Sequence, residues 1–149
     1  MANYVIRVDS STRPATRFVG YGKSSAAWTT HIGAHLIGAG MIYYSHNGPN
    51  KSIYEGILAA LSHLESEHFH PSGTDTVQVL IDCQIVLNQL NGVANVVRMR
   101  KHKALVDRFV NAHPNVTFTF AHQNETVPEY GKVDRISKVG RNWLLNMLR

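Results

Sequence analysis

The feature that most constrains the fold of this chain is the order in which two hydrophobic periodicities follow one another. Three segments rich in β-branched and aromatic residues come first, and such segments are typical of strands. From Ser52 the apolar residues recur at helical spacing, so that Ile53, Ile57 and Leu61 share one face. This order predicts three hairpin-like strands followed by crossover helices, which together form a mixed sheet flanked by helices.

The complete pattern predicts the element order βββαβααβα. Strands are expected over residues 4–8, 19–28, 35–44, 77–81 and 116–120, and helices over residues 52–70, 85–90, 99–112 and 132–148. Gly38 and Gly40 interrupt the third predicted strand, which indicates a bulge or a close approach of another part of the chain. No internal repeat and no long linker divides the 149 residues, so we expect a single α/β domain over residues 1–149.

Composition restricts the cellular setting and the class of partner. Cys83 is the single cysteine, so no internal disulfide can form, which favours an intracellular, cytoplasmic or nuclear protein that is not secreted. The first residues lack the pattern of a signal peptide, and no apolar run is long enough to predict a membrane span. The net charge of +5 and the pI of about 9.6 favour a polyanionic partner such as a nucleic acid.

Aspartates directly follow two of the predicted strands. Asp9 follows the first strand and Asp82 follows the fourth, so both carboxylates would lie at one edge of the sheet if these strands were parallel neighbours. Asp134 falls in the first turn of the last predicted helix, where the helix dipole favours a carboxylate. Each aspartate alone is more often a turn or helix-start residue, but three converging carboxylates would repel one another unless they were protonated or held a cation such as Mg²⁺.

Several motifs resemble those of type 1 ribonuclease H domains, most closely those of plant proteins and of retroelement reverse transcriptases. The most specific is IDCQIVLNQLNG at residues 81–92, which is similar to the family's run D-S-Q-L-V-V-N-Q-L-x-G. VDSS at residues 8–11 resembles the family's D-G-S motif, GYG at residues 20–22 its glycine-rich second strand, and VDRISK at residues 133–138 its terminal A-D-x-L-A-K helix. The resemblance covers nearly the whole chain and implies the ribonuclease H fold.

The resemblance also implies an activity and a metal site. The family hydrolyses the RNA strand of RNA–DNA hybrids with Mg²⁺, for which Mn²⁺ is an alternative, held by four carboxylates. Asp9, Asp82 and Asp134 occupy three of these four catalytic and metal-binding positions. His122 follows the fifth strand, where the family has a mobile histidine that assists proton transfer or product release. The following segment, residues 123–133, is about two residues longer than usual and lacks the family's asparagine.

The fourth carboxylate has two candidate registers. Family members carry N-N-x-A-E at the start of the first helix, and counting from Asn50 offers Glu55 as the catalytic and metal-binding glutamate, about one residue late. Counting back from YEGILAAL at residues 54–61, which matches the family's Y-E-A-L-L-A-A-L, places Ile53 at that position instead. In this second register Glu55 points away, because two residues turn a helix by about 200°. The domain would then be catalytically impaired and would bind nucleic acid or a protein partner without cleavage.

Basic and polar residues at positions matching the family's nucleic-acid contacts complete the predicted site. The basic run could contact the phosphates of an RNA–DNA hybrid or a similar double-stranded duplex, while hydroxyl and amide side chains could reach 2′-hydroxyl groups. The residues concerned are Arg98, Arg100, Lys101, Lys103, Ser10, Ser11, Asn50 and Gln84. The alternative for the basic run is an ordinary solvated helix face. The oligomeric state, the biological substrate and membership of a larger polyprotein stay open.

Overall fold

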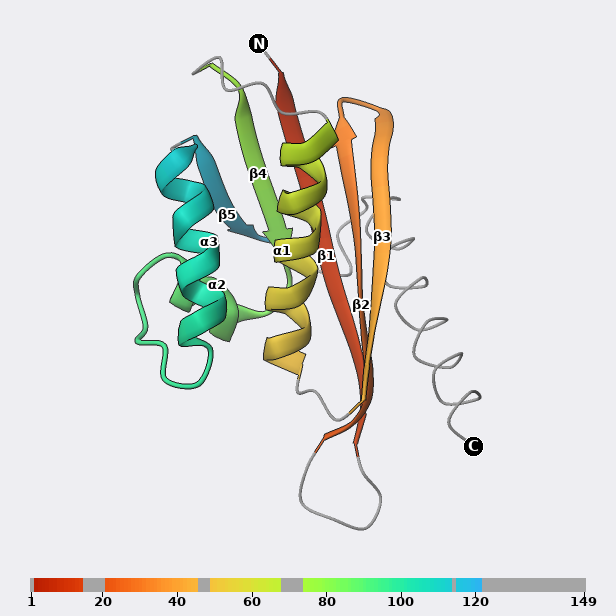
Figure 1. The fold of residues 1–149 in the computed structure, drawn as a ribbon, viewed down its shortest axis with the longest axis vertical. Coiled ribbons are helices and arrows are strands. Elements are labelled where there is room, and N and C mark those ends of the chain that lie inside the picture. The colour runs from red at the N-terminus through yellow and green to blue at the C-terminus, as the bar shows by residue number, and fades with distance from the viewer. Residues whose placement is uncertain (1, 15–20, 46–48, 68–73, 114, 122–149) are drawn as a thin grey trace.

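The structure, a computed structural model, describes residues 2–14, 21–45, 49–67, 74–113 and 115–121. Within these ranges the chain forms five strands and three helices (Figure 1). The strands are β1 Asn3–Pro14, β2 Tyr21–Ile32, β3 His35–Ser45, β4 Thr76–Ile81 and β5 Val116–Phe120, and the helices are α1 Pro49–Glu67, α2 Gln84–Leu90 and α3 Arg100–Ala112. The predicted order is confirmed through the fifth strand, and the helix expected over residues 132–148 lies outside the described residues. None of the described helices is both long and apolar enough to cross a membrane.

The strands form one mixed sheet in the order β3-β2-β1-β4-β5. β1, β2 and β3 pair antiparallel, whereas β4 pairs parallel with β1 and β5 pairs parallel with β4. A parallel pair requires a crossover, and the helices supply it: α1 precedes β4, and α2 and α3 precede β5. The predicted fold class, a mixed five-stranded sheet flanked by helices, is therefore confirmed.

The first strand is longer than the sequence predicts. β1 continues beyond Asp9 to Pro14, because the antiparallel ladder with β2 pairs Asp9 with Ala27 and runs on to the pair of Pro14 with Tyr21. The end predicted for this strand, at residue 8, was therefore wrong, because the strand continues through residues 10–14. Pairing with β4 stops earlier, at the pair of Val8 with Ile81. Asp9 is thus the position at which β1 loses its parallel neighbour while it keeps its antiparallel one.

The core lies between the sheet and α1. The helix face that the sequence predicted to be apolar is buried, and it consists of Ile53, Ile57, Ala60, Leu61 and Leu64. α1 begins at Pro49, earlier than predicted, since proline suits the first turn of a helix. A Cβ atom on Gly56 would come within 2.7 Å of Val8 Cγ1, so α1 lies very close to β1. This close contact positions the start of α1 against the central strands.

The glycines of β3 accommodate a tryptophan and a histidine, as the expected close approach requires. A Cβ atom on Gly40 would lie 2.6 Å from the indole ring of Trp28, and one on Gly38 would lie 2.7 Å from His63 Cε1. The rings of Trp28 and His63 are 5.1 Å apart. The ladder between β2 and β3 also shifts its register between Thr30 and His31. Both alternatives, a bulge and a close approach, are therefore realised.

Helix α3 buries a narrow face. Val106 and Phe109 are buried, but the neighbouring Leu105 is 48% exposed. Adjacent helical residues differ by about 100° in direction, so a helix that packs on a single neighbour cannot bury both Leu105 and Val106 deeply. That neighbour is α1, which lies beside α3 on the same face of the sheet (Figure 1). Leu105 therefore stays exposed, at a hollow that it lines together with Leu58 and Ala59 of α1.

Candidate active site

Asp9 and Asp82 occupy neighbouring positions at the end of a parallel strand pair. β1 and β4 are in register from the pair of Asn3 with Thr76 to the pair of Val8 with Ile81, and the two aspartates are the next residues along each chain segment. Neighbouring strands lie about 4.8 Å apart. The sequence placed both carboxylates at one edge of the sheet on the condition that the two strands are parallel neighbours, and β1 and β4 meet this condition. We call this place the aspartate corner.

The aspartate corner is partly shielded from solvent. Asp9 is 2% exposed, and its Oδ1 accepts a hydrogen bond of 2.9 Å from the backbone N–H of Ser10. Asp82 is half-buried and lies between the end of β4 and the start of α2. Two carboxylates brought together away from water repel each other, and a divalent cation with oxygen ligands offsets this repulsion. The donor atoms present therefore fit Mg²⁺ or Mn²⁺.

The start of α1 also reaches the aspartate corner. Cys83, which follows Asp82, lies with its Sγ atom 3.5 Å from Oδ1 of Asn50 in the first turn of α1. Gln84 opens α2 and donates from Nε2 to Asn88 Oδ1 at 2.8 Å. Of the predicted nucleic-acid residues, Ser10 follows Asp9, Gln84 comes two residues after Asp82, and Asn50 contacts Cys83.

Glu55 lies on a different side of α1. Its Oε1 is 2.7 Å from Nε2 of His102 in α3, and both side chains are about one quarter exposed, at 26% and 20%. Among the described residues no three His, Cys, Asp or Glu side chains are grouped closely enough to hold a metal ion, so Glu55 does not join Asp9 and Asp82 in such a group. A ligand role for Glu55 would require its contact with His102 to break.

Ile53 is part of the hydrophobic core, with 3% of its surface exposed. If residues 54–61 set the register of the helix, Ile53 takes the position of the family's glutamate. An apolar residue at this position is expected to be buried, as Ile53 is. Asp134 and His122 lie outside the described residues, as does the side chain of Ser11. The part of the predicted carboxylate set that the structure brings together is therefore the pair Asp9 and Asp82.

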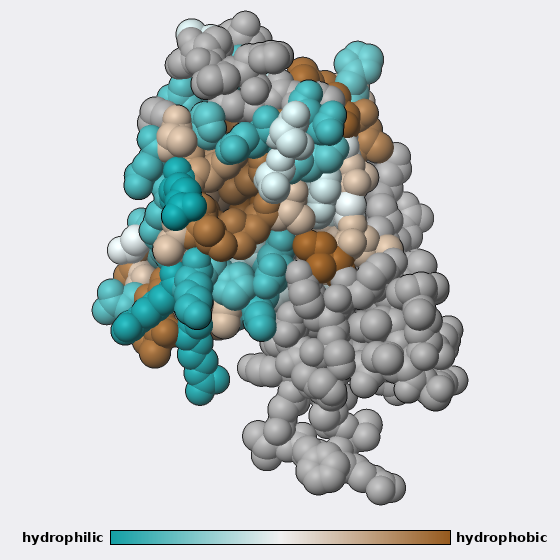
Figure 2. Space-filling model, viewed as in Figure 1, coloured by the Kyte–Doolittle hydropathy of each residue, from teal (hydrophilic) through white to brown (hydrophobic). Residues whose placement is uncertain are grey.

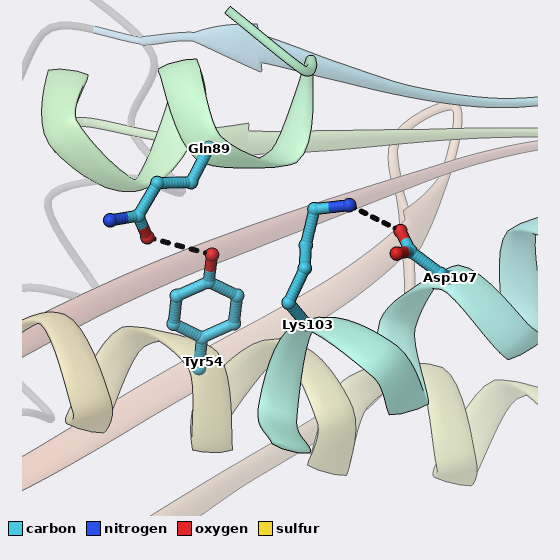
Figure 3. A network of polar contacts seen from close by, with 4 residues as sticks. All are labelled: Tyr54, Gln89, Lys103 and Asp107. Atoms are coloured by element: carbon cyan, nitrogen blue, oxygen red, sulfur yellow. Dashed lines mark hydrogen bonds and ion pairs between the residues drawn. The ribbon is translucent and has the colours of Figure 1, made fainter. Parts of the chain in front are cut away.

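The basic run is not uniformly available to a partner. Arg98, Arg100 and Lys101 are exposed at the start of α3. The Nε atom of Arg100 donates to the carbonyl oxygen of Val96 at 3.3 Å. Lys103 is only 20% exposed and pairs with Asp107 one turn further along α3, at 2.5 Å (Figure 3). Lys103 is therefore the least accessible cation of the four that the sequence singled out.

A buried tyrosine connects the helices behind the aspartate corner. Tyr54 is completely buried, and its hydroxyl donates to Oε1 of Gln89 in α2 at 2.8 Å (Figure 3). Burial raises the pKa of Tyr54 to about 12, with further contributions from the negative charges of Asp107 and Cys83. Tyr54 therefore stays a hydrogen-bond donor at neutral pH. Sequence reasoning missed this pair, although both residues stand inside the two runs that most resemble the family.

Comparison with solved structures identifies the fold. LC11-RNase H1, determined in complex with an RNA/DNA hybrid, has a TM-score of 0.79 at 16% identity and covers 95% of this chain and 99% of its own. The N-terminal ribonuclease H domain of rv2228c from Mycobacterium tuberculosis has a TM-score of 0.83 at 13% identity over 100% of both chains. A protease–reverse transcriptase of prototype foamy virus has a TM-score of 0.72 at 11% identity, covering 93% of this chain and 20% of its own.

The chain therefore has the ribonuclease H fold, as its motifs predicted. The similarity extends to structures of type 1 ribonuclease H domains and of a retroviral reverse transcriptase. No protein-family model matches the sequence, and a search of curated proteins finds no match.

Proposed function

We propose that this chain binds RNA–DNA hybrid duplexes and hydrolyses their RNA strand slowly, in a reaction that depends on a divalent metal ion. The observation that carries the proposal is the adjacent placement of Asp9 and Asp82 at the end of the parallel pair β1 and β4. The net charge of +5 supports a nucleic-acid partner. The hybrid bound by the similar LC11-RNase H1 supports the class of duplex.

In this proposal Asp9 and Asp82, together with Asp134, hold Mg²⁺ or Mn²⁺. When bound, such ions activate a water molecule and stabilise the leaving oxygen in phosphodiester hydrolysis. The backbone N–H of Ser10 donates to Oδ1 of Asp9 and so restrains the orientation of this carboxylate. His122 assists proton transfer or product release.

The duplex is held by two kinds of contact in this proposal. Arg98, Arg100 and Lys101 contact phosphates, which gives an affinity that depends on salt and not on sequence. In this proposal Ser10, Ser11, Asn50 and Gln84 donate to 2′-hydroxyl groups, which distinguish RNA from DNA. Lys103 contributes less, because Asp107 already neutralises it. A cytoplasmic or nuclear location and a retroelement-like origin form part of the same proposal.

The reaction is proposed to be slow because, among the residues that the structure describes, no glutamate joins Asp9 and Asp82 at the aspartate corner. Ile53 offers no oxygen ligand, and Glu55 is engaged by His102. Loss of one carboxylate weakens two-metal chemistry more than it weakens metal binding. The same observation favours a second candidate function, in which the domain binds the duplex without cleaving it.

A cleavage assay separates the two candidates. End-labelled hybrid is incubated with the protein in Mg²⁺ or Mn²⁺, beside Asp82→Asn and the matched control Glu67→Gln, which removes an exposed carboxylate at the end of α1. The first candidate predicts metal-dependent cutting that Asp82→Asn abolishes and Glu67→Gln preserves. Salt-sensitive binding without cutting would select the second candidate. Cutting that persists in Asp82→Asn, or no binding at low salt, would contradict both.

A further inference from the structure

Two polar contacts join α1 to the segment that follows Asp82. At the start of α1, Oδ1 of Asn50 accepts from the thiol of Cys83 at 3.5 Å. About one turn further along α1, the hydroxyl of Tyr54 donates to Oε1 of Gln89 at 2.8 Å. A single contact lets two helices pivot about it, whereas two contacts one turn apart fix their relative rotation. The two contacts together therefore hold α2 and the residues before it in one orientation against α1.

Helix α2 depends on such contacts because it is short. It has seven residues, and no side chain caps its start. Isolated helices shorter than about 12–15 residues are marginal in water, so neighbouring elements must hold α2 in place. Its residues Val86, Leu87 and Leu90 are buried, but apolar burial is non-directional, whereas a hydrogen bond prefers one distance and angle. The bond between Tyr54 and Gln89 therefore sets the orientation of α2 more sharply than apolar burial does.

This hydrogen bond starts from the interior of the protein. Tyr54 is completely buried, so its ring cannot swing out to exchange Gln89 for water. Figure 3 shows the ring extending from α1 toward α2, beside the pair that Lys103 and Asp107 form on α3. The hydroxyl of Tyr54 thus connects α1 to α2 at a place where α3 also lies close by.

The orientation of α2 matters for two amide side chains. Gln84 is the first residue of α2 and is exposed, and Asn50 contacts Cys83, the residue before Gln84. Because Oδ1 of Asn50 accepts from the thiol, its Nδ2 group is left to donate elsewhere. Nε2 of Gln84 donates to Oδ1 of Asn88 at 2.8 Å, which restrains this amide as well. Both amides are therefore held next to the residues that follow Asp82.

The cations proposed to contact phosphates depend less on α2. Arg100 and Lys101 belong to α3, which packs against α1, whereas α2 packs against α1 and β5. Figure 2 shows hydrophilic side chains gathered over the start of α3. Phosphates are common to RNA and DNA, but 2′-hydroxyl groups belong to RNA alone. A change in the orientation of α2 should therefore alter the recognition of RNA and leave most phosphate contacts in place.

We propose that Tyr54 is a positioning residue for the recognition of RNA: through Gln89 it holds α2 in the orientation in which Gln84 and Asn50 reach 2′-hydroxyl groups. Its role is indirect, because a completely buried side chain does not touch a duplex. The role of Tyr54 rests on the proposed binding of RNA–DNA hybrids, and it names the contact that sets the preference for them over DNA.

The preference for hybrid over DNA duplex tests the role of Tyr54. Fluorescence anisotropy gives the dissociation constants of one sequence as RNA–DNA hybrid and as DNA–DNA duplex, without divalent metal ions so that the hybrid stays intact. Tyr54→Phe should reduce the ratio of the two constants about three- to tenfold, the effect of losing one or two neutral hydrogen bonds. The affinity for DNA duplex and its dependence on salt should stay unchanged, because the phosphate contacts remain.

Further variants separate positioning from a general loss of folded protein, and circular dichroism verifies that each is folded. Gln89→Met removes the acceptor of the same bond and should reduce the preference equally, while Tyr54→Phe/Gln89→Met should lose no more. Gln84→Leu should cost less preference in the Tyr54→Phe protein than in the wild type, because Tyr54 acts through α2. Tyr4→Phe is the matched control, since Tyr4 is a buried tyrosine at the start of β1, and it should keep the wild-type preference.

The outcomes distinguish the role of Tyr54 from the proposed function. A folded Tyr54→Phe protein with the wild-type preference would overturn the role of Tyr54 and leave the proposed function in place. Equal losses of affinity for both duplexes would indicate a merely structural tyrosine and would overturn it as well. A wild-type chain that binds both duplexes equally would remove the preference that Tyr54 is proposed to set, and one that binds neither would also overturn the proposed function.

Discussion

Replacement of Gly40 by alanine tests the close packing of β3 against Trp28. The new Cβ atom would lie 2.6 Å from Cε2, Cζ2 and Nε1 of Trp28, whereas carbon atoms in contact prefer about 3.5–4.0 Å. About 1 Å must therefore open between the strand and the indole. Trp28 is 5% exposed and has the His63 ring 5.1 Å away, so it has little room to withdraw. Overpacking of this kind costs about 1–3 kcal/mol.

For a chain of this size, such a loss lowers the melting temperature by roughly 3–10 °C. Urea unfolding followed by tryptophan fluorescence measures the free energy of unfolding directly. Gly38→Ala is the matched control, because its Cβ atom would lie 3.3 Å from Cζ3 of Trp28 and would meet the ring of the half-buried His63 first. Gly40→Ala should therefore be the more destabilising of the two. Equal stability of Gly40→Ala and the wild type would refute the packing argument.

Three further predictions concern the helices and the aspartate corner. Tyr54→Phe removes the hydrogen bond to Gln89 and should cost about 1 kcal/mol in urea unfolding. Because burial raises the pKa of Tyr54 from 10.0 to about 12, the neutral hydroxyl stabilises the fold fully below pH 10, and this contribution is lost as the pH rises to 12. The wild type should therefore lose more stability over that pH range than Tyr54→Phe does. Parallel curves of unfolding free energy against pH for the two proteins would argue against this role of the Tyr54 hydroxyl. Ile53→Glu should raise hybrid cleavage at least about tenfold by supplying a carboxylate at the position of the family's glutamate, at a cost in stability above the roughly 1.5–3 kcal/mol of lost apolar burial, because a carboxylate at this buried position also loses its hydration. An unchanged initial rate in a folded Ile53→Glu protein would count against the proposed activity. Lys101→Ala should reduce the slope of hybrid affinity against salt by about one, whereas Lys103→Ala should change it less because of Asp107, and equal slopes would contradict that distinction.

Local sequence patterns accounted for much of the fold. The change from strand to helix periodicity depends only on neighbouring residues, and it predicted β3, β5 and the buried face of α1 closely. Where a strand ends depends on the neighbouring strand with which it pairs. β1 extends to Pro14 because β2 continues to pair with it, and no feature within residues 10–14 indicates that partner. Leu105 is exposed because none of the residues that the structure describes covers it. The periodicity of one helix shows which residues share a face, but not whether a neighbouring element covers that face.

For the candidate site too, some features follow from the sequence alone and others depend on the tertiary structure. Helix geometry alone allowed Glu55 to point away from the aspartates, but its contact with His102 joins residues 47 positions apart and belongs to the tertiary structure. The sequence by itself determined that Asp9 and Asp82 each follow a buried strand segment. Only the strand order β3-β2-β1-β4-β5 made them neighbours. Register between distant strands arises from packing the whole core at once, so no local pattern specifies it.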